Sequence, residues 1–256
     1  MTGKSALVVG AAGTFGRAGA FALGEAGCNV TVADLNQASI DAVAGDLAAA
    51  NINASAVALW PDSEANAANI VQAAVAVHGR LDIVFIALGT NDVGFVEHQS
   101  EDGWRKVMDA NLDSYWLTCR AAERQFAQQP VAEDRYKITA ASSTRGKLGH
   151  SSGYAAFCAA KAGLGGMVRA LAGEWGQKNI NINAIGPTVF RSPVSEWMFD
   201  EEGLGKAVRE NMLDRIPIGR LGDVDDLMGG LIYLSSPASD FMTGQTIYID
   251  GGYTAI

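Results

Sequence analysis

The sequence contains one group of residues whose types and spacing suit the binding of a phosphate-containing ligand. It consists of three glycines at three-residue spacing, Gly10, Gly13 and Gly16, followed by the acidic residue Asp34. Glycines let a ligand approach the backbone closely. A helix that begins among them offers unpaired N–H groups and a positive dipole end to a pyrophosphate. An acidic side chain about 20 residues further on can accept both ribose hydroxyls of NAD and repels the 2′-phosphate of NADP. The pattern predicts an NAD site, with an ordinary strand–helix turn as the alternative.

Such a site needs a strand before the glycines, a helix after them and a second strand that ends at Asp34. The sequence supplies all three, because residues 6–9 and 29–33 are apolar runs and residues 14–26 are rich in alanine and leucine. Strand and helix patterns then alternate to the C-terminus. We expect strands at 54–59, 82–88, 136–141, 180–185 and 246–249, and helices at 36–50, 63–78, 101–128, 151–177 and 223–235. This alternation predicts an α/β fold with a parallel sheet covered on both faces.

The composition fits one globular domain over residues 1–256. Hydrophobic residues make up 48% of the chain and charged residues 18%, which excludes a disordered protein. The formal net charge is −9 and the sequence has no basic stripe, so we expect no nucleic-acid partner. No apolar run reaches membrane-spanning length, so no membrane partner is expected either.

Cysteine usage predicts a cytoplasmic location. Cys28, Cys119 and Cys158 are odd in number and lie in apolar or helical surroundings, as expected of buried, reduced thiols. No cysteine and histidine cluster has metal-ligand spacing, so no metal is expected. The N-terminus enters a strand within a few residues, which leaves no room for a signal peptide.

Residues 187–222 are irregular by comparison with the rest of the chain. They follow a strand, contain Pro187, Pro193 and Pro217, and include the apolar cluster Trp197-Met198-Phe199. A long segment of this kind is a candidate substrate lid, over about 188–222. The alternative is a surface insertion packed by its own apolar residues.

Over its whole length the sequence resembles the short-chain dehydrogenase/reductase family. Gly10-x-x-Gly13-x-x-Gly16 is similar to the family's cofactor loop, with Thr14 where the family often has another glycine. The other matching motifs are Asn111 in Asp109-Ala110-Asn111-Leu112, the serine loop Ser142-Ser143-x-x-Gly146-x-x-Gly149, the lysine segment at Lys161, Asn183-Ala184-Ile185-Gly186-Pro187, and Thr243-Gly244-Gln245 through Asp250-Gly251-Gly252. The resemblance implies a doubly wound, seven-stranded parallel Rossmann sheet in a single domain. It also implies a homotetramer paired through the two long helices.

The resemblance further implies an NAD(H)-dependent oxidoreductase that interconverts a small-molecule secondary alcohol and a ketone. In the family's chemistry a serine, here Ser143 with Ser142 as the alternative, polarises the substrate oxygen. Lys161 holds the nicotinamide ribose and lowers the pKa of a tyrosine phenol that passes the proton, while Asn111 holds a relay water. Residues expected at the cofactor are Gly10, Gly13, Thr14, Phe15, Gly16, Asp34, Leu35, Trp60, Leu88, Gly89, Lys161, Pro187, Thr188 and Val189.

The chain departs from the family pattern where the catalytic tyrosine is expected. That position, four residues before Lys161, is Phe157, which has no proton to give. Tyr154 lies seven residues before Lys161, and at about 100° per residue the two side chains share a helix face if the helix begins by residue 151 or 152. This spacing resembles the enoyl-reductase branch of the superfamily, so reduction of a C=C bond is an alternative. An ordinary buried stripe has the same spacing, and His150 is a further candidate acid.

Other positions have also lost the polar residues of the family. Ile86-Ala87-Leu88-Gly89 stands where the family has Asn-Asn-Ala-Gly, and Trp60 stands where an aspartate usually meets the adenine. Trp60 either stacks on the base or fills the core. Thr188 replaces a glycine beside the nicotinamide. These losses give a second class of hypothesis, a non-catalytic Rossmann protein that binds NAD(H) or a partner without turnover.

Overall fold

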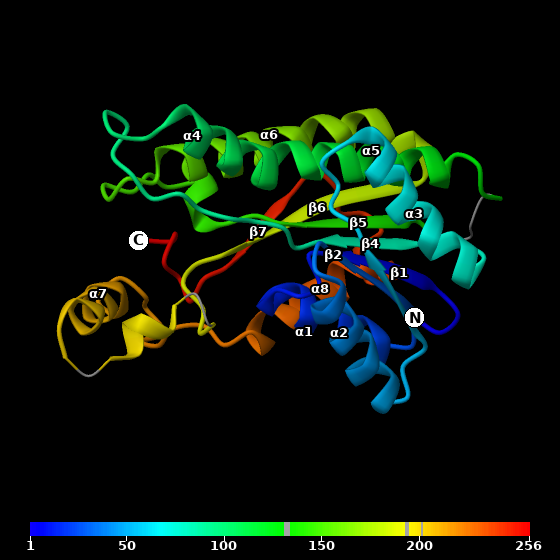
Figure 1. The fold of residues 1–256 in the computed structure, drawn as a ribbon, viewed down its shortest axis with the longest axis horizontal. Coiled ribbons are helices and arrows are strands. Elements are labelled where there is room, and N and C mark those ends of the chain that lie inside the picture. The colour runs from blue at the N-terminus through cyan, green and yellow to red at the C-terminus, as the bar shows by residue number, and fades with distance from the viewer. Residues whose placement is uncertain (131–133, 193–194, 201) are drawn as a thin grey trace.

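A seven-stranded parallel sheet forms the centre of the computed structural model, which describes residues 1–130, 134–192, 195–200 and 202–256 (Figure 1). The strand order is β3-β2-β1-β4-β5-β6-β7. The strands are β1 (Ser5–Val9), β2 (Asn29–Asp34), β3 (Ala54–Ala58), β4 (Ile83–Ile86), β5 (Tyr136–Ala141), β6 (Ile180–Pro187) and β7 (Thr246–Ile249). The predicted doubly wound Rossmann fold is confirmed.

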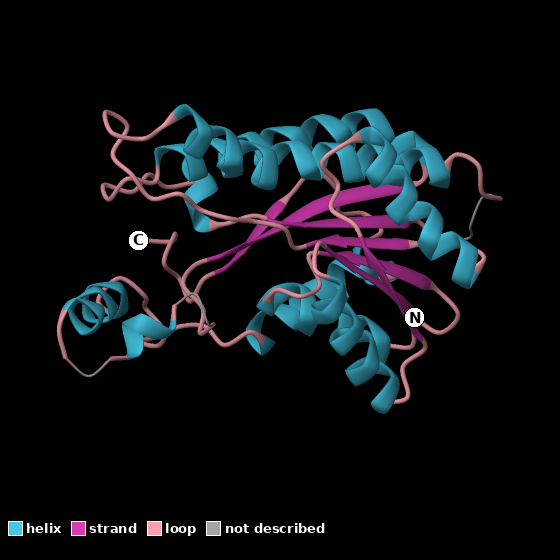
Figure 2. Ribbon diagram, viewed as in Figure 1, coloured by secondary structure: helices cyan, strands magenta, loops and turns pink. Residues whose placement is uncertain are grey.

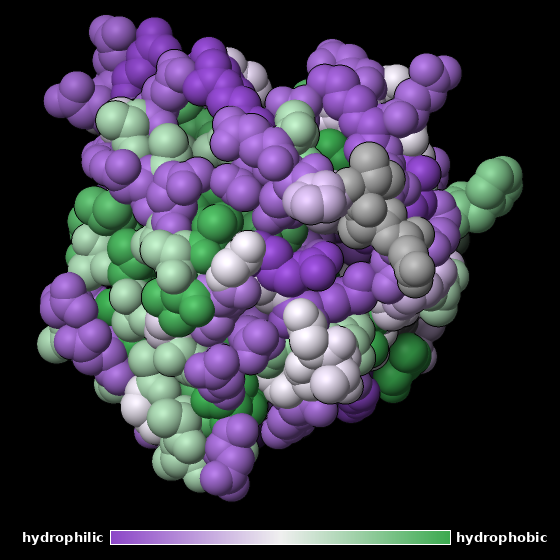
Figure 3. Space-filling model, turned by 90° about the vertical axis from the view of Figure 1, so that its right-hand side faces the viewer, coloured by the Kyte–Doolittle hydropathy of each residue, from purple (hydrophilic) through white to green (hydrophobic). Residues whose placement is uncertain are grey.

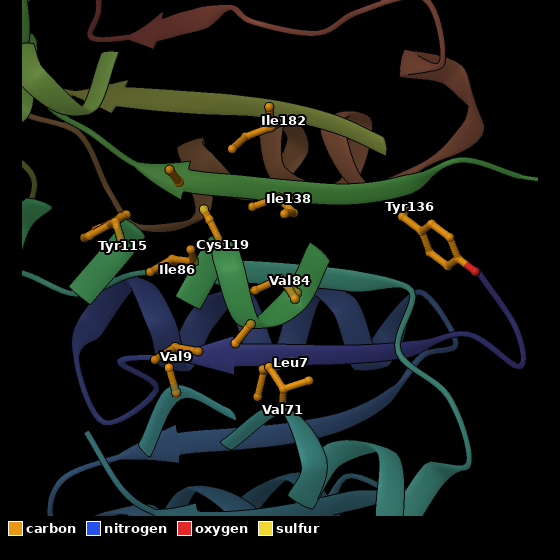
Figure 4. Packing of buried hydrophobic residues seen from close by; sticks show 14 of the residues in the cluster. Leu7, Val9, Val71, Val84, Ile86, Tyr115, Cys119, Tyr136, Ile138 and Ile182 are labelled. Carbon is orange, nitrogen blue, oxygen red and sulfur yellow. The ribbon is translucent and has the colours of Figure 1, made fainter. Parts of the chain in front are cut away.

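Helices cover both faces of the sheet (Figures 1 and 2). One face carries α3 (Glu64–His78), α4 (Glu101–Met108), α5 (Ser114–Phe126) and α6 (Ala155–Trp175), and the other carries α1 (Thr14–Glu25), α2 (Gln37–Ala49) and α8 (Asp225–Ser235). Two hydrophobic clusters result, one on each side of the sheet. In the first, strand residues such as Leu7, Val84 and Ile138 pack against Val71 of α3 and Cys119 of α5 (Figure 4).

The order of the strands places the topological switch point of the sheet at the C-terminal ends of β1 and β4. The chain moves outward from β1 to β2 and β3 and then returns to the other side of β1 as β4. In open α/β sheets, ligands bind at such a switch point, outside the carboxyl ends of the strands. Figure 3 shows the opposite end of the molecule, near the N-terminus, where hydrophilic and apolar residues are interspersed.

Two predicted helices differ from those in the structure. Helix 101–128 is interrupted by a π-helical turn, Asp109–Asp113, between α4 and α5. Helix 151–177 begins only at Ala155, so the expectation that Tyr154 lies on the helix is wrong. The cause is Gly153, whose left-handed φ of +76° breaks the helical run where its carbonyl accepts a hydrogen bond of 3.0 Å from the Gly94 N–H. A side chain at residue 153 would meet the Gly94 backbone at 2.7 Å.

Helix α6 corrects a second expectation. Residues Ala155–Lys178 are long and apolar enough to cross a membrane, by length and composition, although the sequence reading found no such run. The inner face of this helix packs in the core through Leu164, Val168 and Ala172.

The segment predicted as irregular contains structure of its own. Within residues 188–222 the chain forms a 3-10 turn, Glu196–Phe199, and helix α7 (Leu204–Leu213), which the sequence reading did not predict. Met198 and Met212 pack with Ile216, Leu221 and Tyr253 in a third cluster apart from the two main cores. Positions 193–194 and 201 of the candidate lid lie outside the described residues.

Candidate functional site

The glycine turn leaves the beginning of α1 open to an anion. Gly13 is the N-cap and makes no side-chain capping bond, and the first helical hydrogen bond runs 2.8 Å from the Arg17 N–H to the Gly13 carbonyl. The N–H groups of residues 14–16 precede that bond, and such groups are the ones that bind phosphates. A side chain at Gly16 would meet the Gly10 carbonyl oxygen at 2.1 Å, so glycine is needed there for α1 to approach β1.

Asp34 lies directly beside this turn. Its Oδ2 accepts a hydrogen bond of 3.0 Å from the Ala12 N–H, and its Oδ1 accepts one of 2.7 Å from the N–H of the exposed Leu35. Each carboxylate oxygen keeps a second lone pair that can accept a ribose hydroxyl. The nearby cation Arg17 pairs with Asp46 at 2.6 Å. The geometry therefore fits the ribose hydroxyls of a dinucleotide.

Lys161 is buried at the C-terminal ends of β4 and β5, with 3% of its surface exposed. Its Nζ donates a hydrogen bond of 2.9 Å to the Ala141 carbonyl and lies 4.7 Å from the centre of the Tyr115 ring and 5.7 Å from that of Phe157. Burial lowers the pKa of Lys161 to about 7. The amine can therefore gain or lose a proton near neutral pH.

Asn111 and Gly89 complete this cluster. Asn111 lies in the π-helical turn and is buried, and its Nδ2 donates to the carbonyls of Thr90 at 2.7 Å and Val107 at 2.8 Å. Its Oδ1 is buried without a hydrogen-bond partner in the described part of the chain. A side chain at Gly89 would lie 2.9 Å from that oxygen and 3.9 Å from the Lys161 Nζ. Glycine at this position therefore lets the backbone lie close to both polar atoms, which are buried.

Tyr115 is a residue at this site that the sequence reading missed. Its fully buried hydroxyl lies 2.6 Å from the Leu88 carbonyl oxygen, 2.9 Å from that of Ala141 and 3.4 Å from the Lys161 Nζ. In Figure 4 its ring lies at the end of the core nearest the C-terminal ends of the strands. Burial raises the pKa of Tyr115, so it stays a neutral phenol. Its position four residues after Asn111, one helical turn on, was the available signal.

The serine loop is held against the same end of α6. Ser143 caps a 3-10 turn, Thr144–Gly146, and its Oγ accepts a hydrogen bond of 3.1 Å from the Arg145 N–H, which leaves its own O–H free to donate. A side chain at Gly146 would meet the Lys161 carbonyl oxygen at 2.8 Å. Glycine at this position therefore lets the turn lie directly on the Lys161 backbone. The backbone N–H of Ser142 donates to Ile185 at 2.7 Å.

Tyr154 lies just before α6 and belongs to a row of rings. Its ring centre is 4.7 Å from that of His150 and 6.5 Å from that of Phe157. The half-buried Phe157 ring in turn contacts Lys161. In these contacts Phe157 lies between Tyr154 and Lys161. Of the three residues predicted to share a helix face, only Phe157 and Lys161 do so.

The remaining predicted cofactor residues fall into two groups. Phe15 of the glycine turn packs edge-on against Phe190, with ring centres 5.6 Å apart, so the turn contacts the segment after β6. In that segment Thr188 has a buried Oγ1 without a partner among the described residues, and Pro187 and Val189 flank it.

Trp60 is half-buried and packs on the core, beside a groove of about 460 Å³ that it shares with Asp109, Asp113 and Trp116.

The three cysteines differ in burial. Cys28 and Cys119 are buried as predicted, whereas Cys158 is only half-buried, so that part of the prediction is wrong. Its Sγ lies 3.8 Å from the Leu148 carbonyl. Across the described ranges no group of three His, Cys, Asp or Glu side chains could hold a metal ion.

Comparisons with known proteins place this arrangement in a family. The family model described as Enoyl-(Acyl carrier protein) reductase matches residues 10–254. An uncharacterized oxidoreductase of Mycobacterium tuberculosis is 44% identical over 252 residues, which cover 98% of this chain and 92% of that protein. The 2-dehydro-3-deoxy-D-gluconate 5-dehydrogenase of Dickeya dadantii is 31% identical over 260 residues, covering 100% of this chain and 97% of that enzyme.

A solved structure agrees with the fold and with a nicotinamide cofactor. The gluconate 5-dehydrogenase of Burkholderia cenocepacia, in complex with NADP and tartrate, superimposes with a TM-score of 0.91 at 26% identity and covers 100% of this chain and 97% of its own. The family model, the two relatives and the solved structure all indicate the same family. The chain belongs to the short-chain dehydrogenase/reductase family and is an oxidoreductase.

Proposed function

We propose that this oxidoreductase uses NAD(H) to interconvert a small-molecule secondary alcohol and a ketone, with a proton donor other than residue 157. The observation that carries the proposal is the cluster of Lys161, Asn111 and Gly89 at the strand ends, next to the open N-terminus of α1. Family membership favours this enzyme over the non-catalytic alternative.

Each residue has a role that its surroundings support. When bound, the nicotinamide supplies or accepts the hydride. The free O–H of Ser143 donates to the substrate oxygen, and the unpartnered Asn111 Oδ1 holds a water beside the Lys161 Nζ. Lys161, whose pKa burial lowers to about 7, holds the ribose and exchanges protons with that water near neutral pH. Phe157 fills the position that the family gives to tyrosine.

The cofactor preference rests on Asp34, since its carboxylate beside the glycine turn would repel a 2′-phosphate. Calorimetric titration should give at least tenfold tighter binding of NADH than of NADPH. Asp34→Asn should weaken NADH binding by roughly 10- to 100-fold, because it removes a charged hydrogen bond worth about 1.5–3 kcal/mol. The same variant should reduce the ratio of NADH affinity to NADPH affinity. Equal binding of the two cofactors by the wild type would contradict NAD as the cofactor.

The proton donor is proposed to be Tyr154, with His150 as the alternative. The two rings are in contact beside Phe157, and the His150 Nδ1 accepts a hydrogen bond of 3.2 Å from the Ser152 N–H. The variants Tyr154→Phe and His150→Gln separate them, because the donor's removal should lower kcat by roughly 100-fold or more with unchanged NADH affinity. If neither variant changes kcat, both assignments fail.

Reduction of an activated C=C bond is a second candidate. The family model's description names an enoyl reductase, and Tyr154 lies seven residues before Lys161. Product analysis after reaction of NADH with an enone distinguishes a saturated ketone from an allylic alcohol. A saturated ketone as the sole product would replace the alcohol–ketone proposal.

A further inference from the structure

Two arginines from distant parts of the chain meet at one aromatic ring beside the serine loop. Arg145 follows Ser143 by two residues, and its guanidinium lies 5.7 Å from the centre of the Tyr253 ring. Arg215 comes directly after α7 and Asp214, and its guanidinium lies 4.5 Å from the same centre. The candidate lid and the serine loop thus each place a positive charge at Tyr253.

Neither guanidinium has a carboxylate partner among the described residues. The side chain of Arg145 donates 3.3 Å to the Gly149 carbonyl. Arginines elsewhere on the surface do pair with carboxylates, namely Arg17, Arg80, Arg120, Arg124 and Arg220. Asp250, in the turn that carries Tyr253, has its oxygens bound by the N–H groups of Gly252 at 3.0 Å and Thr254 at 2.9 Å. Neither Arg145 nor Arg215 therefore takes part in an ion pair within the described part of the chain.

Two other polar groups at this place favour a ligand. Tyr253 is 1% exposed, and its hydroxyl is buried with no hydrogen-bond partner in the described ranges. Burial and the charges of Arg145 and Arg215 lower the pKa of His150, so its ring is neutral near pH 7. Because its Nδ1 accepts from the Ser152 N–H, its proton is assigned to Nε2, which can donate.

We propose that Arg145 and Arg215 bind an anionic group of the substrate beside Ser143, so that the enzyme acts on a hydroxy acid or keto acid. The guanidinium fork matches a carboxylate or a phosphate with two parallel hydrogen bonds. The chain as a whole carries a net charge of −9 and repels anions at long range, so an anionic substrate needs such a local cluster. The proposal names the substrate class of the proposed function and rests on it.

The test uses acids and neutral alcohols of the same skeleton. D-gluconate and D-glucitol differ only in a carboxylate in place of a hydroxymethyl group, as do 3-hydroxybutyrate and 1,3-butanediol, and mandelate and 1-phenyl-1,2-ethanediol. Each compound is titrated calorimetrically into the full chain, with and without saturating NADH. We expect at least one acid to bind tenfold or more tightly than its neutral counterpart, and binding should weaken as salt is added.

Variants then assign the preference to the arginines. Arg145→Gln and Arg215→Gln should each weaken binding of the acid at least tenfold while binding of the alcohol stays the same. Arg105→Gln, on the exposed side of α4, is the matched control and should change neither. Arginines that only stack on Tyr253 would lower the melting temperature without removing the acid preference, and that result would overturn the proposal. So would equal binding of acid and alcohol in all three pairs.

Two further arms separate the possible outcomes. Glucitol 6-phosphate carries the anion as a phosphate, and tighter binding of it than of gluconate would identify a phosphate as the anion that the arginines hold. Titration with NADH alone tests the proposed function independently. If NADH does not bind but the acid preference still depends on both arginines, the proposed function fails and the anion site stands.

Discussion

Lys161 connects the burial of a single residue to the pH dependence of the whole protein. Its pKa falls from an ordinary 10.5 to about 7 because burial penalises the ammonium form. Between these values the unfolded chain binds a proton that the folded protein has lost, so this residue's contribution to the free energy of unfolding rises with pH. Below pH 7 Lys161 is protonated in both the folded and the unfolded protein, so burial of its charge lowers the free energy of unfolding by the full amount.

We therefore expect the stability of the wild type relative to Lys161→Met to rise between pH 7 and 10, by up to about 1.4 kcal/mol for each pH unit. Urea denaturation of both proteins without cofactor, at several pH values, measures this difference. Lys106→Met, on the exposed side of α4, should show a difference that does not change with pH. A constant difference for Lys161→Met would contradict the lowered pKa.

Tyr115 is predicted to stabilise the end of the core at which Lys161 lies. Its hydroxyl is within hydrogen-bond distance of the carbonyls of Leu88 and Ala141, at the ends of neighbouring strands. Tyr115→Phe leaves a buried carbonyl without its donor, which should lower the free energy of unfolding by about 1–3 kcal/mol. Tyr233→Phe, at an exposed position of α8, should change it by less than about 0.5 kcal/mol. Equal effects in denaturant titrations would assign no role to the Tyr115 hydroxyl.

At the scale of the element, the glycine turn depends on how closely α1 approaches β1. The predicted strand, glycines and helix are all present, and a side chain at Gly16 would meet the Gly10 carbonyl oxygen at 2.1 Å. Gly16→Ala should destabilise the protein by about 1–3 kcal/mol through overpacking, and should weaken NADH binding because the helix N-terminus moves. Calorimetry and thermal unfolding measure the two effects.

Gly45→Ala is the matched control for this prediction. Gly45 lies in the interior of α2, and a side chain there would meet no atom within 4 Å. The substitution should stabilise the helix by up to about 1 kcal/mol, the difference in helix propensity, with NADH affinity unchanged. If both variants behave alike, close approach of α1 and β1 is not what requires Gly16.

Local patterns predicted the elements well where hydrophobic periodicity alone determines them. The strand at residues 136–141 has the predicted bounds, and the helix predicted at residues 63–78 ends at His78 as expected. The start of α6 could not be predicted, because the contact between Gly153 and Gly94 joins segments distant in the sequence. Helix α7 was missed because it lies between prolines in a segment whose apolar residues pack on Tyr253 rather than on the sheet.

Some residues of the candidate site could likewise be predicted from local sequence patterns, and others could not. Gly10, Gly16 and Asp34 could be found from the sequence because their chemistry depends on spacing within one strand–helix–strand unit. The positions of Arg145 and Arg215 depend on contacts between separate elements, which no local pattern encodes. The roles of Asn111, Ser143 and Lys161 came from the family resemblance, and their catalytic functions stay predictions.

At the scale of the whole molecule, apolar surface remains on the outer side of α6. The inner face packs on the sheet, whereas small residues line the exposed face, namely Ala159, Ala162, Gly163, Ala170 and Gly173. Small side chains let a second helix approach closely, and the family resemblance implies a tetramer paired through the two long helices. Although Arg169 and Glu174 are also exposed on α6, we expect this face of small residues to be covered in an oligomer.

Ala170→Glu tests whether this face joins copies of the chain. The substitution places a charge on the exposed face of α6, so an interface there would have to bury an unpaired carboxylate. Light scattering should give the wild type four times the 26.7 kDa chain mass and the variant a smaller assembly. Ala76→Glu, an identical change on the exposed face of α3, should leave the mass unchanged. A tetramer that survives Ala170→Glu would place the subunit contacts on another face, and a wild-type monomer would mean that this apolar helix face stays in water.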